Sequence, residues 1–271
     1  MRALAALPLA LVAGCTSATF AEPRILVSPY LALYQLRGDV ALQAFAAGPA
    51  FPVDRTPQTM RTFGQDHHRE DFGVRADIGD GFAGVRFDYY QLDMNTSRVG
   101  TLTDDWGDLL AGDQVRMRAE MDELRIGYLE SLGTLRTTWR DHPLTVRFAG
   151  GGVFSHRDLA LRARTEDGVR SQNVEIEGDT VFAAARCRAS WRDWALEAEY
   201  AASPEIVLGG DFEGFQQDLE LRLAYTMPLH DVTFFGGYRL SMFDAEGHAG
   251  RLAYDADLTI DGFQFGLSVT F

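Results

Sequence analysis

The densest group of titratable side chains is the stretch 66–71, which reads Asp-His-His-Arg-Glu-Asp. Imidazole nitrogens and carboxylate oxygens bind divalent cations, and a His beside a carboxylate can activate water. A metal site here would use His67, His68 and Asp71, but adjacent strand residues point to opposite faces, which weakens this interpretation. Asp104 and Asp105 form a second acidic site next to Trp106. We expect solvated loops at both places, and we assign no catalytic, cofactor or metal residue.

A larger set of arginines and carboxylates alternates with apolar residues along the chain. These residues are Arg86, Asp88, Arg125, Arg147, Arg186, Arg188, Glu197, Glu199, Glu220, Arg222 and Arg239. If the face that they share is enclosed, their mixed signs predict a paired network that satisfies charges away from bulk water. A selectivity filter for a narrow solute path is the functional alternative, with charge rings setting ion preference. We favour the paired network.

The composition excludes several classes of protein. Of 271 residues, 46% are hydrophobic and 24% are charged, which is ordinary for a folded chain and atypical of a disordered one. The net charge is −14, and every basic residue is an arginine. A protein this acidic is a poor candidate for binding the phosphates of nucleic acid, so we expect no nucleic-acid partner.

The N-terminus is typical of an export signal. Arg2 precedes the apolar run 3–14, which is too short for a membrane-spanning helix of about 20 residues. Cleavage after Ala21 would define a signal peptide over 1–21 and a mature domain over 22–271. Alternatively, Val12-Ala13-Gly14-Cys15 resembles a lipobox, which would give a lipoprotein signal over 1–14 and lipidation of Cys15. Cys187 is the second cysteine, and we expect neither a disulfide nor a cysteine-based metal site.

Period-2 alternation dominates the rest of the chain and predicts strands. The last segment is the clearest case, because every second residue is apolar, namely Phe263, Phe265, Leu267, Val269 and Phe271. Similar segments carry Arg or Glu on one face and aliphatic or aromatic residues on the other. Many such strands, without a helix-period segment, do not easily share one water-soluble core. We therefore expect the apolar faces to contact lipid.

Turn signals divide the mature chain into ten strands in which short and long connections alternate. The expected strands are 24–37, 67–78, 81–94, 115–131, 143–163, 174–191, 194–208, 214–227, 231–244 and 251–271. An even number of strands with both termini on the short-turn side predicts a closed antiparallel up-and-down transmembrane β-barrel, with short periplasmic turns and longer extracellular loops. In the fourth strand the apolar phase changes, and a bulge near Asp122 would explain the change.

Aromatic and apolar residues outside the alternation support this reading. Trp139, Trp191 and Trp194 sit at expected short turns, where membrane proteins place an interfacial belt. The stretch 40–53 is apolar for a loop, and we expect it to pack a short helix across the barrel mouth or against the lip. Insertion into the outer leaflet or contact with a partner is the alternative.

The final strand resembles that of small outer-membrane β-barrel proteins of Gram-negative bacteria, on the strength of Phe271 and the ladder from Phe263 to Val269. In such proteins a terminal strand of this form is the assembly signal. The resemblance implies outer-membrane lipid, the barrel assembly machinery and periplasmic chaperones as partners, and no cofactor. Ten strands with acidic and His residues at the rim also resemble, in outline, the omptin proteases, in which Asp–His and Asp–Asp pairs activate water.

Three functions follow from these features. The first is an outer-membrane barrel with a structural, adhesive or narrow-pore role, a largely plugged lumen and no catalytic activity. The second is an outer-membrane protease or lipid hydrolase acting at the extracellular rim through His67 and Asp71. The third is a lipidated, water-soluble β-barrel tethered at Cys15. We expect the first; the sequence specifies neither a ligand nor an oligomeric state.

Overall fold

A computed structural model describes residues 24–44, 55–65, 67–95, 98–203, 207–210, 212–228 and 230–271. The predicted leader, in both cleavage versions, and Cys15 lie outside these ranges. The elements are β1 (Arg24–Ala44), β2 (Gln58–Thr59), the 3-10 helix η2 (Met60–Phe63), β3 (Arg69–Gly79), β4 (Gly84–Asn95), β5 (Gly100–Thr101), β6 (Gln114–Trp139), β7 (His142–Thr165), β8 (Ser171–Trp191), β9 (Trp194–Ser203), β10 (Val207–Gly210), β11 (Phe212–Thr226), β12 (Val232–Ala249) and β13 (Leu252–Thr270). No helix in the described parts is long and apolar enough to cross a membrane.

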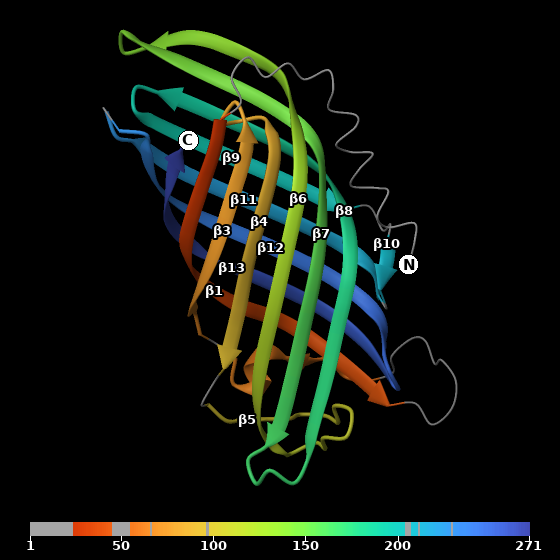
Figure 1. Ribbon diagram of the computed structural model, residues 1–271. Helices are drawn as coiled ribbons and strands as arrows, with labels where there is room; N and C mark the ends of the chain where they lie inside the picture. The colour runs from red at the N-terminus through yellow and green to blue at the C-terminus, as the bar shows by residue number, and fades with distance from the viewer. Residues whose placement is uncertain are drawn as a thin grey trace.

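Ten of these strands form a closed antiparallel ring, as far as the structure describes the chain. The order is β1, β3, β4, β6, β7, β8, β9, β11, β12 and β13, and β13 pairs back onto β1 (Figure 1). The short β10 continues the line of β9 along β8, while β2 and β5 add to β1 and β6. The predicted up-and-down barrel of about ten strands is therefore confirmed.

The register of the ring sets its width. Following paired residues from Ile25 around all ten strands leads back to Arg37, twelve residues further along β1. A shear of this size tilts the strands by about 40° and gives a backbone diameter of about 20 Å. Side chains can fill an interior of that width.

The two ends of the barrel differ. Both described termini lie at one end, where the Phe271 N–H donates to the Ile25 carbonyl at 2.9 Å, and the turns after β3, β6, β8 and β11 lie at the same end. At the other end, the connections after β1 and β4 are long and carry η2 and β5. The connection after β12 is a two-residue turn, not the expected loop over 244–250, because β12 and β13 pair as far as Ala249 and Leu252.

The outward side chains near the short-turn end are apolar. Large exposed apolar residues occur on every ring strand except β8, whose outward positions there hold alanines and Cys187. Representatives are Leu31, Phe72, Phe87, Leu124, Phe148, Leu196, Leu221, Phe234 and Phe265. Phe265 and Leu223 are about half exposed (51% and 50%), so they do not fill a protein core. This surface matches the apolar band, about 25 Å tall, of barrels that span membranes.

Nearer the long-loop end, the polarity of the two faces reverses. On β6, Met117, Ala119 and Met121 point inward and are buried, whereas Leu124 further along points outward. The in-and-out alternation itself is unbroken, so the predicted bulge near Asp122 is wrong. The phase change marks the level at which the outer face becomes polar and the inner face apolar. The irregularity in β6 falls between Ser131 and Gly133.

Apolar side chains close the barrel at the long-loop end. Trp106 is fully buried, packs edge-on against Phe63 at 4.9 Å and donates its indole N–H to the Val40 carbonyl at 3.2 Å. Val40 and Leu42 belong to β1 and point inward, so this part of the stretch 40–53 is strand, and the expected short helix is wrong here. The rest of that stretch, 45–53, lies outside the described residues.

Candidate functional site: a charge-packed lumen

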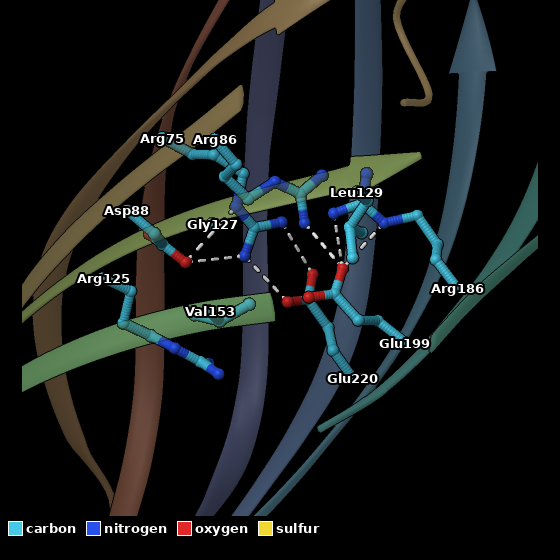
Figure 2. Close-up of a pocket in the computed structure, with 10 residues that line it drawn as sticks. All are labelled: Arg75, Arg86, Asp88, Arg125, Gly127, Leu129, Val153, Arg186, Glu199 and Glu220. Carbon is cyan, nitrogen blue, oxygen red and sulfur yellow. Dashed lines mark hydrogen bonds and ion pairs between the residues drawn. The ribbon is translucent and has the colours of Figure 1, made fainter. Parts of the chain in front are cut away.

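The middle of the barrel is crossed by buried arginines held between carboxylates. Arg75 on β3 is 2% exposed and reaches Asp88 on β4 at 2.9 Å and Glu220 on β11 at 2.7 Å (Figure 2). The carboxylates have further donors, because Tyr30 binds Asp88 at 3.0 Å and Gln264 binds Glu220 at 2.7 Å. Each charge therefore has several partners, which is the condition for holding ions away from water.

A second group lies beside it, closer to the short turns. Arg86 on β4 contacts Asp77 on β3 at 2.6 Å and Glu199 on β9 at 2.7 Å. Arg186 on β8 contacts the same Glu199 at 2.7 Å (Figure 2). It also donates to the Phe82 carbonyl at 2.6 Å. Glu199 thus joins Arg86 and Arg186, and through Arg86 the group also includes Asp77, so that it links β3, β4, β8 and β9.

Glu197 joins the next strands of the wall. It accepts from Arg222 on β11 at 2.5 Å and lies 2.8 Å from Arg188 on β8. Arg188 also donates to the Gly81 carbonyl at 2.7 Å, in the turn between β3 and β4. This turn folds inward and places the buried Phe82 ring under the arginines, with the Arg147 guanidinium 4.6 Å from the ring centroid.

A third group lies nearer the apolar core. Arg239 on β12 contacts Asp218 at 2.7 Å and Glu123 at 3.1 Å, and its guanidinium lies 4.5 Å from the Tyr90 ring centroid. Arg125 also binds Asp218, at 2.5 Å, and Arg157 binds Glu123 at 2.9 Å. Glu123 is completely buried, and its position between β6, β7 and β12 makes it a centre of the network.

The structure places all eleven residues expected in the lumen on the inner face of the ring. Arg147 is the outlying member, since it lies at the short-turn end and pairs with Asp80. Sequence reasoning missed Arg75, Asp77, Glu123, Arg157 and Asp218. Arg75 alternates with Val74 and Ala76, so the same period-2 signal could have found it. Glu123 was hidden because the apolar phase of its strand reverses beside it.

The network leaves almost no free space. A cavity lined by Arg75, Arg125 and Glu199 offers about 20 Å³ to the centre of a water molecule (Figure 2). About one water molecule needs 10–15 Å³ measured in this way. This cavity among the charges therefore has room for about one water molecule.

The rim residues do not share a site with the network. Asp71 at the start of β3 accepts a hydrogen bond from the Asp93 backbone N–H at 3.1 Å, and His68 is exposed. Asp105 pairs with Arg55 at 3.2 Å, while its neighbour Trp106 is buried in the cap. Asp66 lies outside the described residues, so the full cluster is not seen. The acid–base role of these groups stays a sequence-based hypothesis.

Three tryptophans lie at the short-turn end. Trp139 and Trp191 pack edge-on with ring centroids 4.9 Å apart, and Trp194 packs against Tyr225 at 4.9 Å. Trp139 and Trp194 are about half exposed. The expected assembly signal lies at the same end, where Phe263, Phe265 and Leu267 are exposed on the outer face, Val269 is half-buried and the terminal Phe271 is 76% exposed.

No family model matches the sequence, and no curated protein is similar to it at a significant level. Solved structures that resemble it are outer-membrane proteins. The outer membrane protease OmpT from Escherichia coli is 8% identical, with 92% of this chain and 97% of that chain covered and a TM-score of 0.46. A Pseudomonas aeruginosa FadL homologue (11% identity, 92% and 90% covered, TM-score 0.26) and the P. putida toluene transporter TodX (7%, 92% and 89%, 0.27) are further examples. At these identities the similarity concerns the fold, and no activity is carried over.

The arginines of the lumen are paired with carboxylates on facing strands. These ion pairs link strands that do not pair in the sheet, such as β3 and β11.

Proposed function

We propose that the protein is an integral outer-membrane β-barrel that does not conduct solutes and serves as a structural or adhesive element of the cell envelope. The observation that carries the proposal is the polarity of the two faces of the barrel wall. Towards the short-turn end, side chains on the outer face are apolar, and those on the inner face at the same level are ion-paired. A soluble barrel has the opposite arrangement, with its apolar residues inside.

The part of the barrel between the apolar band and the long-loop end supports a role at the cell surface. Its outer face is polar and charged, with exposed residues on several strands, and its interior is a packed apolar core. Examples on the outer face are Arg37, Asp93, Asp158, Arg162, Glu175, Asp244 and Asp257. This long-loop part is built like a water-soluble barrel, with apolar residues inside and charged residues outside. It projects from the membrane and presents a rigid, charged surface. Such a surface suits contact with other molecules better than transport.

Planar-bilayer recording tests the closed lumen. We expect purified, folded protein to insert without producing conductance steps. As a matched comparison, replacing the inward Arg125 and Arg239 by alanine removes two long side chains that fill the layer, and we expect leak currents if this variant still shows heat-modifiable migration. Regular conductance steps from the wild-type protein would show that it is a pore.

Membrane insertion is tested by extraction. Carbonate should leave the protein in the membrane fraction, and external protease should cut connections at the long-loop end but spare the strands. Cleavage throughout the chain, including the strands, would favour the tethered, water-soluble barrel. Mass analysis of the mature N-terminus would then show whether Cys15 carries lipid.

A further inference from the structure

The hairpin formed by β6 and β7 extends past the end of the barrel. The pairing between β4 and β6 ends at Gly84 and Leu129, but β6 continues to Trp139. A shear of twelve over ten strands offsets neighbouring strand ends by only one or two residues, so tilt does not account for this length. The hairpin is visible as the yellow-green ribbon that projects at the top of Figure 1. Every residue of the stretch 130–139 is exposed.

One edge of this hairpin has no strand beside it in the described structure. β6 pairs with β7 as far as Trp139 and His142, and its opposite edge is open beyond Leu129. Arg140 and Asp141 both have positive φ, 50° and 63°, as a two-residue type I′ turn requires. Such a turn is closed by a hydrogen-bonded pair, here Trp139 and His142.

Hydrogen-bonded and non-hydrogen-bonded residue pairs alternate along an antiparallel hairpin, starting here from the pair of Trp139 and His142. This alternation identifies the backbone groups of β6 that have no partner in β7. The pairs of β6 residues 135, 137 and 139 with β7 are hydrogen-bonded, so the N–H and C=O groups of Thr134, Arg136 and Thr138 point to the open edge. Pro143 agrees with this assignment, because it has no N–H and lies opposite Thr138. The open edge thus presents a ladder of three residues, ready to pair with another strand.

The middle of the edge is basic in an acidic protein. Arg136 lies at the centre of the ladder, between Thr134 and Thr138, whereas the tip holds charges of both signs, Arg140 and Asp141. The chain as a whole carries a net charge of −14. On the outer face of the same strand, Leu135 is 63% exposed. An extended segment with carboxylates on one face and apolar residues on the other would complement both faces.

We propose that this edge of β6 is a docking site for an extended, acidic segment of another protein, which adds as a strand beside Thr134, Arg136 and Thr138. That the site faces the periplasm rests on the proposed function. A second copy fits less well. Two barrels in one membrane share an orientation, so their β6 edges would meet in parallel with Arg136 facing Arg136, and like charges directly opposite are unfavourable.

The test uses the full-length mature protein folded in detergent micelles and a labelled peptide of about nine residues with alternating Val and Glu. Fluorescence anisotropy should show saturable binding to the wild type. Thr138→Pro removes one edge N–H, and proline is tolerated on an edge strand. We expect it to weaken binding at least tenfold. Thr138→Val keeps the N–H and should bind like the wild type.

Charge is tested separately. Arg136→Glu should weaken binding at least tenfold, and Arg136→Lys should change it less than threefold. All variants must show the heat-modifiable migration of the wild type, so that lost binding is not lost folding. No saturable binding by the wild type, or equal binding by Thr138→Pro and Thr138→Val, would overturn the proposal.

The location of the site is tested in cells, independently of binding. A Thr138→Cys variant in a Cys187→Ala background should react with a membrane-impermeant maleimide only after the outer membrane is permeabilised. Labelling of intact cells would contradict the periplasmic orientation and the proposed function, while the micelle binding would still decide whether the edge pairs with peptides.

Discussion

Arg75 and Glu220 face each other across the barrel through two hydrogen bonds of 2.9 and 2.7 Å, although they are 145 residues apart in the sequence. Their strands, β3 and β11, are not neighbours in the sheet. The contact therefore ties together parts of the wall that backbone pairing leaves independent.

Breaking this contact should destabilise the barrel strongly. In Arg75→Ala, the buried carboxylates of Asp88 and Glu220 lose their common partner, which typically costs about 3–5 kcal/mol in a buried network. Arg118→Ala is the matched control on the outer face, because Arg118 pairs with Asp93 and Glu120 while about 43% exposed. We expect the control to change stability by less than about 1 kcal/mol. Urea unfolding in lipid vesicles, followed by tryptophan fluorescence, measures the free energy of unfolding of both variants. Equal losses would show that the buried ion pairs of the lumen stabilise the barrel no more than an exposed pair does.

The cap at the long-loop end should depend on one side chain. Trp106→Ala removes the fully buried ring that packs on Phe63, and large-to-small changes of this kind cost about 3–5 kcal/mol. Trp106→Phe keeps most of the volume and loses the hydrogen bond to the Val40 carbonyl, so a smaller loss is expected. The same unfolding assay ranks the two variants. A Trp106→Ala protein as stable as the Phe variant would show that the cap is not packed as described.

A charged residue placed in the apolar band should destabilise the inserted protein. Leu221 on β11 is 44% exposed near the middle of the band, and Leu221→Arg should destabilise the inserted protein by about 2–4 kcal/mol. Asp244→Arg, on the neighbouring β12 but above the band, should be neutral or stabilising, because Asp244 lies opposite Asp257. Refolding into vesicles gives both values. If Leu221→Arg has no effect, lipid does not cover this face.

Low pH should weaken the turn after β3. Partial burial alone would raise the pKa of Asp80, but hydrogen bonds from the Ala83 and Phe82 N–H groups and from Arg147 outweigh it and hold the pKa below its ordinary value of 3.8. A lowered folded-state pKa stabilises the protein above the unfolded-state pKa, and this contribution is lost as the pH falls through the folded-state value. Because Asp80 is 41% exposed, the effect should stay below about 1 kcal/mol. Asp80→Asn should remove this pH dependence below pH 4; an unchanged difference between pH 7 and pH 3 would contradict it.

The terminal residue should matter for assembly more than for stability. Phe271 is mostly exposed and contributes two backbone hydrogen bonds with Ile25, which any residue can form. Phe271→Ser should therefore refold in detergent like the wild type. In cells, the amount of heat-modifiable protein in the outer membrane should fall severalfold, as the resemblance of the terminal strand to an assembly signal implies. Equal amounts in the membrane would remove that role from Phe271.

Much of the architecture could be predicted from the sequence because a barrel is governed by alternation and turns. The ten strands and the inward set that includes Arg86 and Arg239 follow from period 2. Partners across the lumen could not be predicted, since the contact between Arg75 and Glu220 depends on a register that only closure fixes. The fourth strand misled the prediction for another reason. Met121 and Leu124 are both buried from water, one by protein and the other by the expected lipid, and residue type alone cannot distinguish these surroundings.

The reversal of polarity along each strand has a consequence for the position of the molecule in a bilayer. Sinking by two residues would bring Asp93 or Asp257 toward hydrocarbon, and rising by two would lift Phe72 or Leu31 into water. Either displacement carries a penalty on several strands at once, so the chain encodes its own immersion depth. A membrane thinner or thicker than the apolar band would have to adapt to the protein, and local lipid thickness around it should be set by these side chains.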